Sequence, residues 1–385
     1  MANLLNKLRM LDVEPKRNAP KAISSESMFH RCQAIFPVSL FGDRSHARPD
    51  ILESIYGFAF PADLSPEDIL FLDTETTGLS GGAGTVAFQI GVGYFTHSGF
   101  VVEQFMMHDY PEEASMLQTW NALMKRFSVI CTFNGRTFDI PLLKTRFIMN
   151  RIADPNIPPF HADALYPSRR LWKLRLKRCN LAHLEEQLLH VVREDDLPGA
   201  LVPQTFFQYL KDGNFQPMER ILEHNKQDIV SLAQLFYFMC KQVDVPEEIS
   251  ESEDLFSLAR ALEKNGQQEK AIHCYRLSTG TQMCARAHES LARIEKKRGN
   301  TDAAVKLYQT MVLQNENPVA ACEALAKLYE HRLRDIPSAL SYTRQALLLL
   351  SEPVLFQNEA VQEQRNALQY RYSRLRKKLS AIQAK

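Results

Sequence analysis

The sequence carries acidic residues at spacings that suit divalent-metal chemistry, and the first pair is Asp73 and Glu75. They follow an apolar run from Ile69 to Leu72, which is typical of a buried strand. Side chains two residues apart on a strand point to the same face, so the two carboxylates project together. A hard cation such as Mg²⁺ or Mn²⁺ would offset the cost of burying them. The alternative is a strand end with two solvated acids before a glycine-rich turn.

Further residues occur where an active site would need them, namely Asp139, Asp163, His224 and Asp228. Asp139 follows an Asn-Gly turn at the expected start of a helix, where the helix dipole favours a carboxylate. His224 and Asp228 are four residues apart on an expected amphipathic helix and therefore lie one turn apart. Asp163 falls near the end of an expected strand. Taken singly, each has a structural alternative, such as a helix cap, a solvated helix face or a surface histidine.

The elements expected around these residues alternate between strands and helices. Strands are expected at 69–73, 85–95, 100–108, 129–133 and 160–165, and helices at 112–126 and from residue 138. Three strands, helix, strand, helix, strand is the order of the ribonuclease-H-like α/β core, a mixed sheet flanked by helices. The lead-in before it is expected to be irregular, apart from a short helix at 1–10 and a polar stretch at 12–25.

Beyond an acidic connector, the sequence repeats itself with a period of about 33–35 residues. A Leu-Ala pair recurs at Leu258-Ala259, Leu291-Ala292 and Leu325-Ala326. Such helix pairs resemble tetratricopeptide repeats, which stack and bind peptides; helical hairpins without a repeat relation are the alternative. The expected domains are a lead-in (1–64), a ribonuclease-H-like domain (65–242), a linker (243–253) and an all-α repeat domain with a C-terminal helix (254–385).

Composition excludes several protein classes. The chain has 385 residues, 45% of them hydrophobic and 24% charged, which predicts a globular protein of two or three domains. A formal net charge of +1 indicates no general basic surface. Seven scattered cysteines without a C-x-x-C pair predict reduced thiols. Without a signal peptide or a membrane-length apolar run, we expect a cytoplasmic protein with no membrane contact.

In combination, these acidic residues resemble the DEDD family of 3′→5′ exonucleases. Gly135-Arg136-Thr137-Phe138-Asp139-Ile140-Pro141 and His224-Asn225-x-x-Asp228 resemble the YprB-type branch of ribonuclease-H-like proteins, in which tetratricopeptide repeats follow the nuclease-like domain. The resemblance implies hydrolysis of phosphodiesters with two divalent ions, Mg²⁺ or Mn²⁺.

The same resemblance implies a role for each residue of the site. Asp73 would bridge both metals, Glu75 and Asp228 would complete one metal site, and Asp139 would hold the other. His224 would orient or deprotonate the attacking water. Family members place tyrosine four residues, or histidine five residues, before the last Asp, whereas this chain has histidine at the spacing of four. Asp163 is expected to support the site or to cap a helix.

A basic run after Asp163, residues 169–178, contains six cations and no acid. Its position predicts a phosphate track for single-stranded nucleic acid, although a solvated helix face is the usual explanation of such a run. The expected nucleic-acid contacts are Thr74, Arg169, Arg170, Lys173 and Arg175. Trp172 is expected in the core rather than stacked on a base. Asn134 would position substrate or simply make its turn.

The sequence therefore predicts a metal-dependent 3′→5′ exonuclease whose repeat domain recruits a protein partner or restricts substrate access. The competing interpretation is a non-catalytic adaptor that binds nucleic acid through the nuclease-like fold. The presence of all four acids favours activity. A phosphatase or another two-metal hydrolase is less favoured, because the sequence contains no histidine-rich metal cluster.

Overall fold

The computed structural model describes residues 29–78, 84–153, 155–193, 197–351 and 359–383. It forms two compact units, which we call the sheet domain and the helical region. The sheet domain comprises the residues up to Ile249 together with Lys264–Gly266, and the helical region comprises Ser250–Glu263 and Gln267–Lys385. The helix expected at 1–10, the polar stretch at 12–25 and most of the glycine-rich turn after Gly78 lie outside the described residues.

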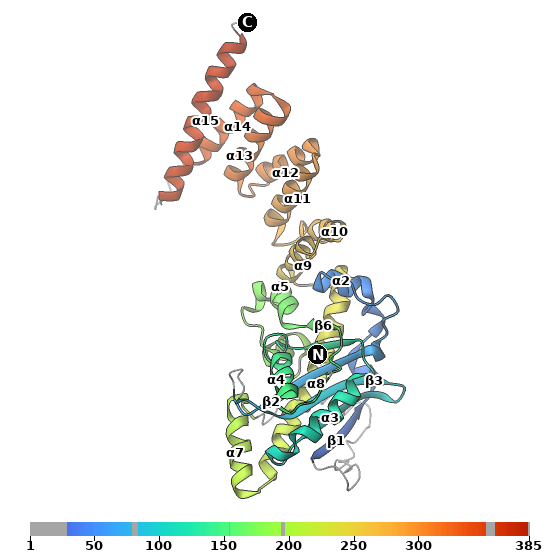
Figure 1. The fold of residues 1–385 in the computed structure, drawn as a ribbon. Helices are drawn as coiled ribbons and strands as arrows, with labels where there is room; N and C mark the ends of the chain where they lie inside the picture. Colours follow the sequence, from blue (N-terminus) through green and yellow to red (C-terminus); the bar gives the residue numbers. More distant parts are fainter. Residues whose placement is uncertain (1–28, 79–83, 154, 194–196, 352–358, 384–385) are drawn as a thin grey trace. The chain divides into compact units, whose positions relative to one another are not determined.

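The sheet domain is built on a six-stranded mixed sheet in the order β1-β4-β3-β2-β5-β6 (Figure 1). β1, β4, β3 and β2 pair antiparallel, and β5 and β6 continue the sheet parallel to β2. The strands are β1 (His30–Phe36), β2 (Ile69–Thr76), β3 (Ala87–Thr96), β4 (Gly99–Met106), β5 (Val129–Thr132) and β6 (Phe160–Asp163). The predicted mixed sheet flanked by helices is confirmed, and the five predicted strands are present with ends shifted by a few residues.

Helices cover both faces of this sheet. They are α2 (Pro49–Tyr56), α3 (Glu113–Met124), α4 (Asp139–Met149), α5 (Leu165–Leu176), α6 (Leu181–Leu184), α7 (Val202–Asp212) and α8 (Gln216–Asp244). Phe71 on β2 packs against Phe236 and Tyr237 of α8, with ring centroids 5.6 and 6.1 Å apart. Leu70 and Leu72 point the other way, into the core that they share with α3 and α4. Because side chains alternate along a strand, β2 presents alternate residues to α8 and to α4.

Two glycines on β3 allow α8 to approach the sheet closely. A Cβ atom at Gly91 would lie 1.9 Å from Oδ1 of Asn225 on α8. A Cβ atom at Gly93 would lie 2.5 Å from Cγ2 of Ile229, one turn further along the same helix. Glycines inside a strand commonly mark such a close approach. They bring the helix that carries His224 and Asp228 against the strand that carries the first two acids.

From residue 29 on, where the structure describes it, the segment expected to be an irregular lead-in contains β1 and α2 of the sheet domain, which corrects that prediction. β1 pairs along its whole length with the edge of β4, from His30 opposite Met106 to Phe36 opposite Phe100. The strand was missed because an edge strand needs only partial burial and shows weak alternation. Ile35, for example, is 56% exposed.

A charged contact joins this segment to the end of α8. Asp244 accepts hydrogen bonds from Arg48 at 2.7 and 2.9 Å, and its Oδ2 lies 2.7 Å from Nδ1 of His46. The arginine bonds are the main reason that the pKa of Asp244 falls to about 2. The contact ties the segment before β2 to the helix that carries part of the site.

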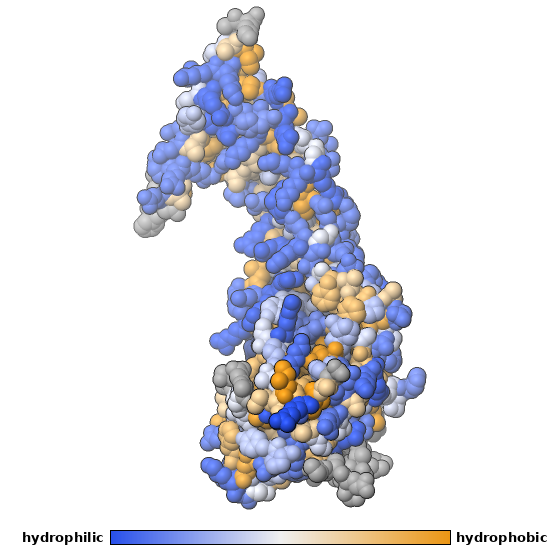
Figure 2. Space-filling model, in the orientation of Figure 1, coloured by the Kyte–Doolittle hydropathy of each residue, from blue (hydrophilic) through white to orange (hydrophobic). Residues whose placement is uncertain are grey.

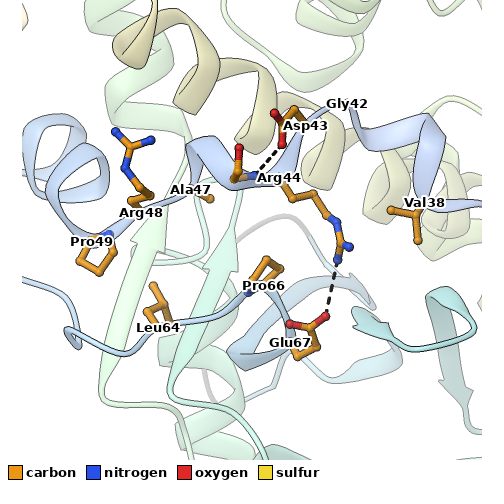
Figure 3. A pocket seen from close by; sticks show the side chains of 11 residues that line it. Val38, Gly42, Asp43, Arg44, Ala47, Arg48, Pro49, Leu64, Pro66 and Glu67 are labelled. Carbon is orange, nitrogen blue, oxygen red and sulfur yellow. Dashed lines mark hydrogen bonds and ion pairs between the residues drawn. The ribbon is translucent and has the colours of Figure 1, made fainter.

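Figure 3 shows a pocket between this segment and the turn that precedes β2. Arg44 points across it toward Glu67, at a distance of 3.7 Å, and its guanidinium lies over the ring of Phe95. Pro66 and Glu67 lead into β2 at its N-terminal end, whereas Asp73 and Glu75 lie in its C-terminal half. The pocket is therefore remote from the acidic residues along this strand.

The helical region consists of paired helices in which neighbours pack on one another. These are α9 (Ser252–Lys264), α10 (Gln268–Ser278), α11 (Cys284–Arg298), α12 (Thr301–Leu313), α13 (Pro318–Leu328), α14 (Ile336–Leu349) and α15 (Glu359–Gln383). All three recurring Leu-Ala pairs are buried. In the view of Figure 2, the surface of this region is predominantly hydrophilic. An all-helical C-terminal part is thus confirmed.

The turn between the paired helices differs in the third unit. Gly266 and Gly299 each adopt a left-handed backbone, with φ of 79° and 83°. The matching position of the next unit is Arg334, with φ of 57°, preceded by a π-helical turn at Tyr329–Leu333. That wider turn accommodates additional residues and lengthens the repeat.

The basic cluster of the last helix, α15, is engaged by a buried acid. Glu330 is 1% exposed at its side chain and pairs with Arg371, Arg374 and Lys378 at 2.6–2.8 Å. These ion pairs therefore hold α15 to the preceding helices. The seven cysteines are all unpaired, as predicted. Among the described helices, none is long and apolar enough to cross a membrane.

Candidate active site

The alternation of β2 distributes its polar residues between the two faces of the sheet. Asp73 and Glu75 point to the face covered by α8, as Phe71 does, whereas Thr74 points toward α4. Their position in the sequence makes this unavoidable once Phe71 and Leu72 are buried on opposite faces. The predicted co-projection of Asp73 and Glu75 is thereby supported by the geometry.

Asp73 is held by an asparagine that sequence analysis did not single out. Nδ2 of Asn225, fully buried on α8, donates to Oδ2 of Asp73 at 2.9 Å. Oδ1 of Asn225 accepts from Nε2 of Gln104 at 2.9 Å, so the amide is fixed in orientation. Burial, and then the charges of Asp228, Glu75 and Asp139, raise the pKa of Asp73 well above its usual range.

Glu75, His224 and Asp228 form a compact cluster between β2 and α8. One ligand atom of each lies within 4.8 Å of the other two. Nε2 of His224 is 3.9 Å from Oε1 of Glu75 and 3.5 Å from Oδ2 of Asp228. The three side chains are only 12–16% exposed. The one-turn spacing of His224 and Asp228, expected from the sequence, thus directs both toward β2.

Asp139 lies on the other face, at the first residue of α4. It is 5% exposed, and the hydroxyl of Thr74 donates a hydrogen bond to its Oδ1. Burial raises the pKa of Asp139 to about 6, against the lowering effect of the Thr74 hydrogen bond. Since the Thr74 hydroxyl is buried and used in this way, its side chain orients Asp139. The nucleic-acid contact expected of Thr74 stays a prediction.

Asp163 organises the turn that delivers Asp139. Its carboxylate accepts hydrogen bonds from the backbone N–H groups of Asn134, Arg136 and Leu165, at 2.9, 2.9 and 3.0 Å. Asn134 takes a left-handed backbone with φ of 70°, and its Oδ1 accepts from the hydroxyl of Thr137 at 2.9 Å. Both residues therefore shape the turn before α4, and Asp163 also accepts from the first residue of α5, as a helix cap does. The roles expected of them in the site stay predictions.

An arginine that sequence analysis missed enters the cluster. Arg193 pairs with Asp228, and its Nη1 lies 3.3 Å from Nδ1 of His224. It also donates to Glu185 through Nε and Nη2, at 2.7 and 2.6 Å. With an arginine donor facing Nδ1, a neutral His224 carries its proton on Nε2. No local pattern in the sequence marks Arg193. Asn225 lies inside the His-Asn-x-x-Asp motif, and this position is the signal that could have identified it.

The basic run forms α5 and its end, beside the Asp163 turn. Arg169 and Lys173 are exposed, Arg170 and Arg175 are half-buried, and Trp172 is in the core, as expected. A hollow of about 450 Å³ lies next to the turn and is lined in part by Arg136, Arg170, His161, Phe58 and Tyr166. Phe58 and Tyr166 are each more than a third exposed. Cations and aromatic faces are thus present together at the start of α4.

The donor set fits a divalent cation. Carboxylate oxygens are the preferred ligands of Mg²⁺ and Mn²⁺, whereas an imidazole nitrogen suits Zn²⁺ and other transition metals. Glu75, His224 and Asp228 offer three such atoms within a small volume. Burial, and then the crowded negative charge, raise the pKa of Asp73, and a bound cation would relieve that charge. Glu75, His224 and Asp228 are thus a candidate metal-binding group.

Comparisons with known proteins agree with this fold. Residues 70–240 match a family model described as the RNase_H superfamily. The Bacillus subtilis (strain 168) protein named "Uncharacterized protein YprB" is 32% identical over 291 residues, which cover 73% of this chain and 69% of that protein. The matched family segment spans β2 to α8 and so contains every acid of the cluster. This chain therefore belongs to the YprB family, and its sheet domain to the ribonuclease H superfamily.

Proposed function

We propose that this protein is a metal-dependent nuclease, a 3′→5′ exonuclease of the DEDD type that hydrolyses phosphodiester bonds of single-stranded nucleic acid. The observation that carries the proposal is the gathering of Asp73, Glu75, Asp139 and Asp228 around the end of β2. A structural role does not account for four acids here, because each one raises the cost of burying the others.

In the proposed mechanism, Asp73, Glu75, Asp139 and Asp228 would hold two divalent ions, which when bound would supply positive charge to the attacking and leaving oxygens of the scissile phosphate. Asp73, Glu75 and Asp228 would contribute ligands from the α8 side of the sheet, and Asp139 would contribute one from the α4 side. Asn225 and Thr74 orient Asp73 and Asp139 respectively, so that both carboxylates are presented in a fixed geometry. His224 would orient the attacking water or accept its proton, which requires an unprotonated ring nitrogen facing that water.

We place the single strand over the hollow beside the Asp163 turn and along α5. Arg136 and Arg170 would contact phosphates, and the exposed rings of Phe58 and Tyr166 would stack on bases. Arg169, Lys173 and Arg175 remain proposed backbone contacts further along α5. None of these contacts distinguishes sequences, so the proposal is for binding without sequence preference.

The helical region is proposed to be a tetratricopeptide-like array that binds a protein partner. The support is the period of about 33–35 residues, with buried Leu-Ala pairs and left-handed turn residues at matching positions. Arrays of this kind use the groove between successive helix pairs for peptides. Loss of a partner on truncating α9–α14 would be the corresponding observation.

The test is degradation of single-stranded DNA and RNA, labelled at the 3′ or the 5′ end, in Mn²⁺, Mg²⁺ or EDTA. Loss of 3′ nucleotides that requires metal is expected. Asp73→Asn should lower the rate by roughly 10²–10³-fold or more, the size of losing one preorganised charged group. Asp63→Asn, an exposed acid of the same domain, is the matched control and should keep the wild-type rate.

Two outcomes would contradict the proposal. Equal activity of Asp73→Asn and wild type would remove the site assignment. Tight binding of nucleic acid without cleavage in any metal would favour the non-catalytic adaptor instead.

A further inference from the structure

The guanidinium of Arg193 occupies a position where a nuclease site of this composition would hold a metal cation. Nη2 of Arg193 pairs with Oδ1 of Asp228, whose Oδ2 faces Nε2 of His224 at 3.5 Å. Nη1 lies 3.3 Å from Nδ1 of His224. One positive group thus contacts two of the three residues that could ligate an ion, and it is only 12% exposed.

Glu185, which is not one of the candidate metal ligands, holds this arginine in place. Its side chain is 1% exposed, and it accepts the Nε and Nη2 hydrogens of Arg193 in a two-pronged arrangement. A carboxylate buried to this extent requires a cation, because leaving it unpaired is strongly unfavourable. Arg193 therefore stays beside the site whether or not Asp228 is available to it.

Asp228 has two competing partners. An arginine is charged at every physiological pH, so Arg193 neutralises Asp228 whenever the two are in contact. A divalent ion on Asp228 would place a second cation within a few ångströms of the guanidinium, at a site shielded from solvent. Like charges at that distance repel, so either the guanidinium moves away from Asp228 or the divalent ion binds more weakly.

We propose that Arg193 is a resident counter-ion of the site: it neutralises Asp228 in the metal-free protein and is displaced from Asp228, while anchored on Glu185, when a divalent ion binds. This inference rests on the metal site of the proposed function. Arg193 acts as a positioning residue that sets metal affinity, so that the carboxylates are held apart and ordered before metal arrives. Displacement also frees Nδ1 of His224 from its arginine donor.

The chain provides space for this displacement. A groove of about 840 Å³ adjoins the cluster and has both Arg193 and His224 in its lining. Glu219 and Glu223 line the same groove. The groove also has Arg220 and Lys226 in its lining, so a guanidinium that leaves Asp228 would enter a polar environment of mixed charge while keeping its contact with Glu185.

The experiment measures Mn²⁺ binding by calorimetry in the absence of nucleic acid, so that its readout is independent of activity. Arg193→Met alone leaves Glu185 buried without its partner, so the informative variant is the double change Glu185→Met with Arg193→Met. We expect it to bind Mn²⁺ roughly tenfold more tightly than wild type, because one like charge beside the site has been removed. Arg193→Lys retains the charge and should keep an affinity near that of wild type.

Lys226→Met is the matched control, because Lys226 lines the same groove and its recorded ion pair is with the exposed Glu223. It should leave Mn²⁺ affinity unchanged. Unchanged or weaker binding by the double variant, with normal binding by wild type, would overturn the role of Arg193 and leave the metal site intact. Absence of binding by both proteins would overturn the metal site and this inference together.

Discussion

At the scale of single residues, Asp73 and Asp139 are buried carboxylates that lie close to other negative charges. Asp73 receives one hydrogen bond from Asn225 and faces three other carboxylates. Asp139 receives one from Thr74 and is nearly inaccessible to solvent. In each case neutral donors orient the carboxylate without neutralising it. Such residues reduce stability unless a cation binds, which is a common cost at functional sites.

The first prediction concerns the pH dependence of the metal-free protein. The pKa of Asp139 is raised from 3.8 to about 6 in the folded state, so the folded protein binds this proton more tightly than the unfolded chain does. Its stability should therefore fall as pH rises from about 4 to about 6, and level off above. Thermal unfolding of wild type and Asp139→Asn in EDTA should diverge over that range, by on the order of 3 kcal/mol.

Asp63→Asn, measured in the same way, supplies the baseline for loss of a solvated carboxylate. A difference between wild type and Asp139→Asn that does not change with pH would contradict the assignment. So would a difference of the opposite sign, since a carboxylate stabilised by its surroundings gains stability as pH rises.

At the scale of elements, the site depends on how closely α8 approaches β3. Gly91 lies opposite Asp73 in the sheet, and the space above it is filled by Asn225, the residue that holds Asp73. Gly93 provides the same clearance for Ile229. The two glycines thus connect a feature of one strand to the orientation of a carboxylate on the next.

Gly91→Ala should therefore affect both stability and metal binding. Its Cβ atom would lie 1.9 Å from Oδ1 of Asn225, so either the amide or the helix must move. We expect a loss of about 1–3 kcal/mol in the free energy of unfolding, typical of overpacking, together with weaker Mn²⁺ binding. Gly199→Ala, where a Cβ atom would meet nothing within 4 Å, is the control in denaturant unfolding. A Gly91→Ala protein as stable as that control would refute the close approach.

The attachment of α15 can be tested separately. Glu330→Gln removes the charge that holds Arg371, Arg374 and Lys378. Because these cations are partly exposed, we expect a cost of about 1–3 kcal/mol, below that of breaking a fully buried pair. Hydrogen exchange in Glu359–Gln383 should become faster, and exchange in the sheet domain should not change. Glu363→Gln, an exposed position on the same helix, should have no effect.

At the scale of the whole molecule, the chain has two units that can be monitored independently. Its two tryptophans, Trp120 and Trp172, are both buried in the sheet domain. Tryptophan fluorescence therefore reports on the unfolding of that domain alone. Far-ultraviolet circular dichroism reports on both units, and is dominated by helices.

Mg²⁺ should consequently raise the midpoint temperature of unfolding that tryptophan fluorescence reports for the sheet domain. The midpoint temperature of the helical region, followed by circular dichroism, should not change. At a free concentration about 100 times the dissociation constant, linkage predicts roughly 2.7 kcal/mol of added stability, which corresponds to a shift of several degrees. Asp73→Asn should abolish this shift. Equal shifts of both transitions would indicate that the two units unfold as one.

The sequence by itself determined the features that depend on neighbours along the chain. Local patterns predicted the five strands and the helices that follow them. They also predicted the candidate site residues: the apolar run precedes Asp73, the Asn-Gly turn precedes Asp139, and His224 and Asp228 are spaced by one helical turn. The repeat period predicted paired helices. Each of these follows from local patterns of burial and backbone geometry, which are legible within a short window.

The tertiary structure decided the contacts between residues far apart in the sequence. β1 is weakly patterned because an edge strand is only half covered, and it is recognised only once it pairs with β4. Asn225 reaches Asp73 across 152 positions, through space that Gly91 leaves open. The role of Arg193 is recognised only from its ion pairs with Glu185 and Asp228. Ion pairing depends on distance in space and produces no periodic pattern in the sequence.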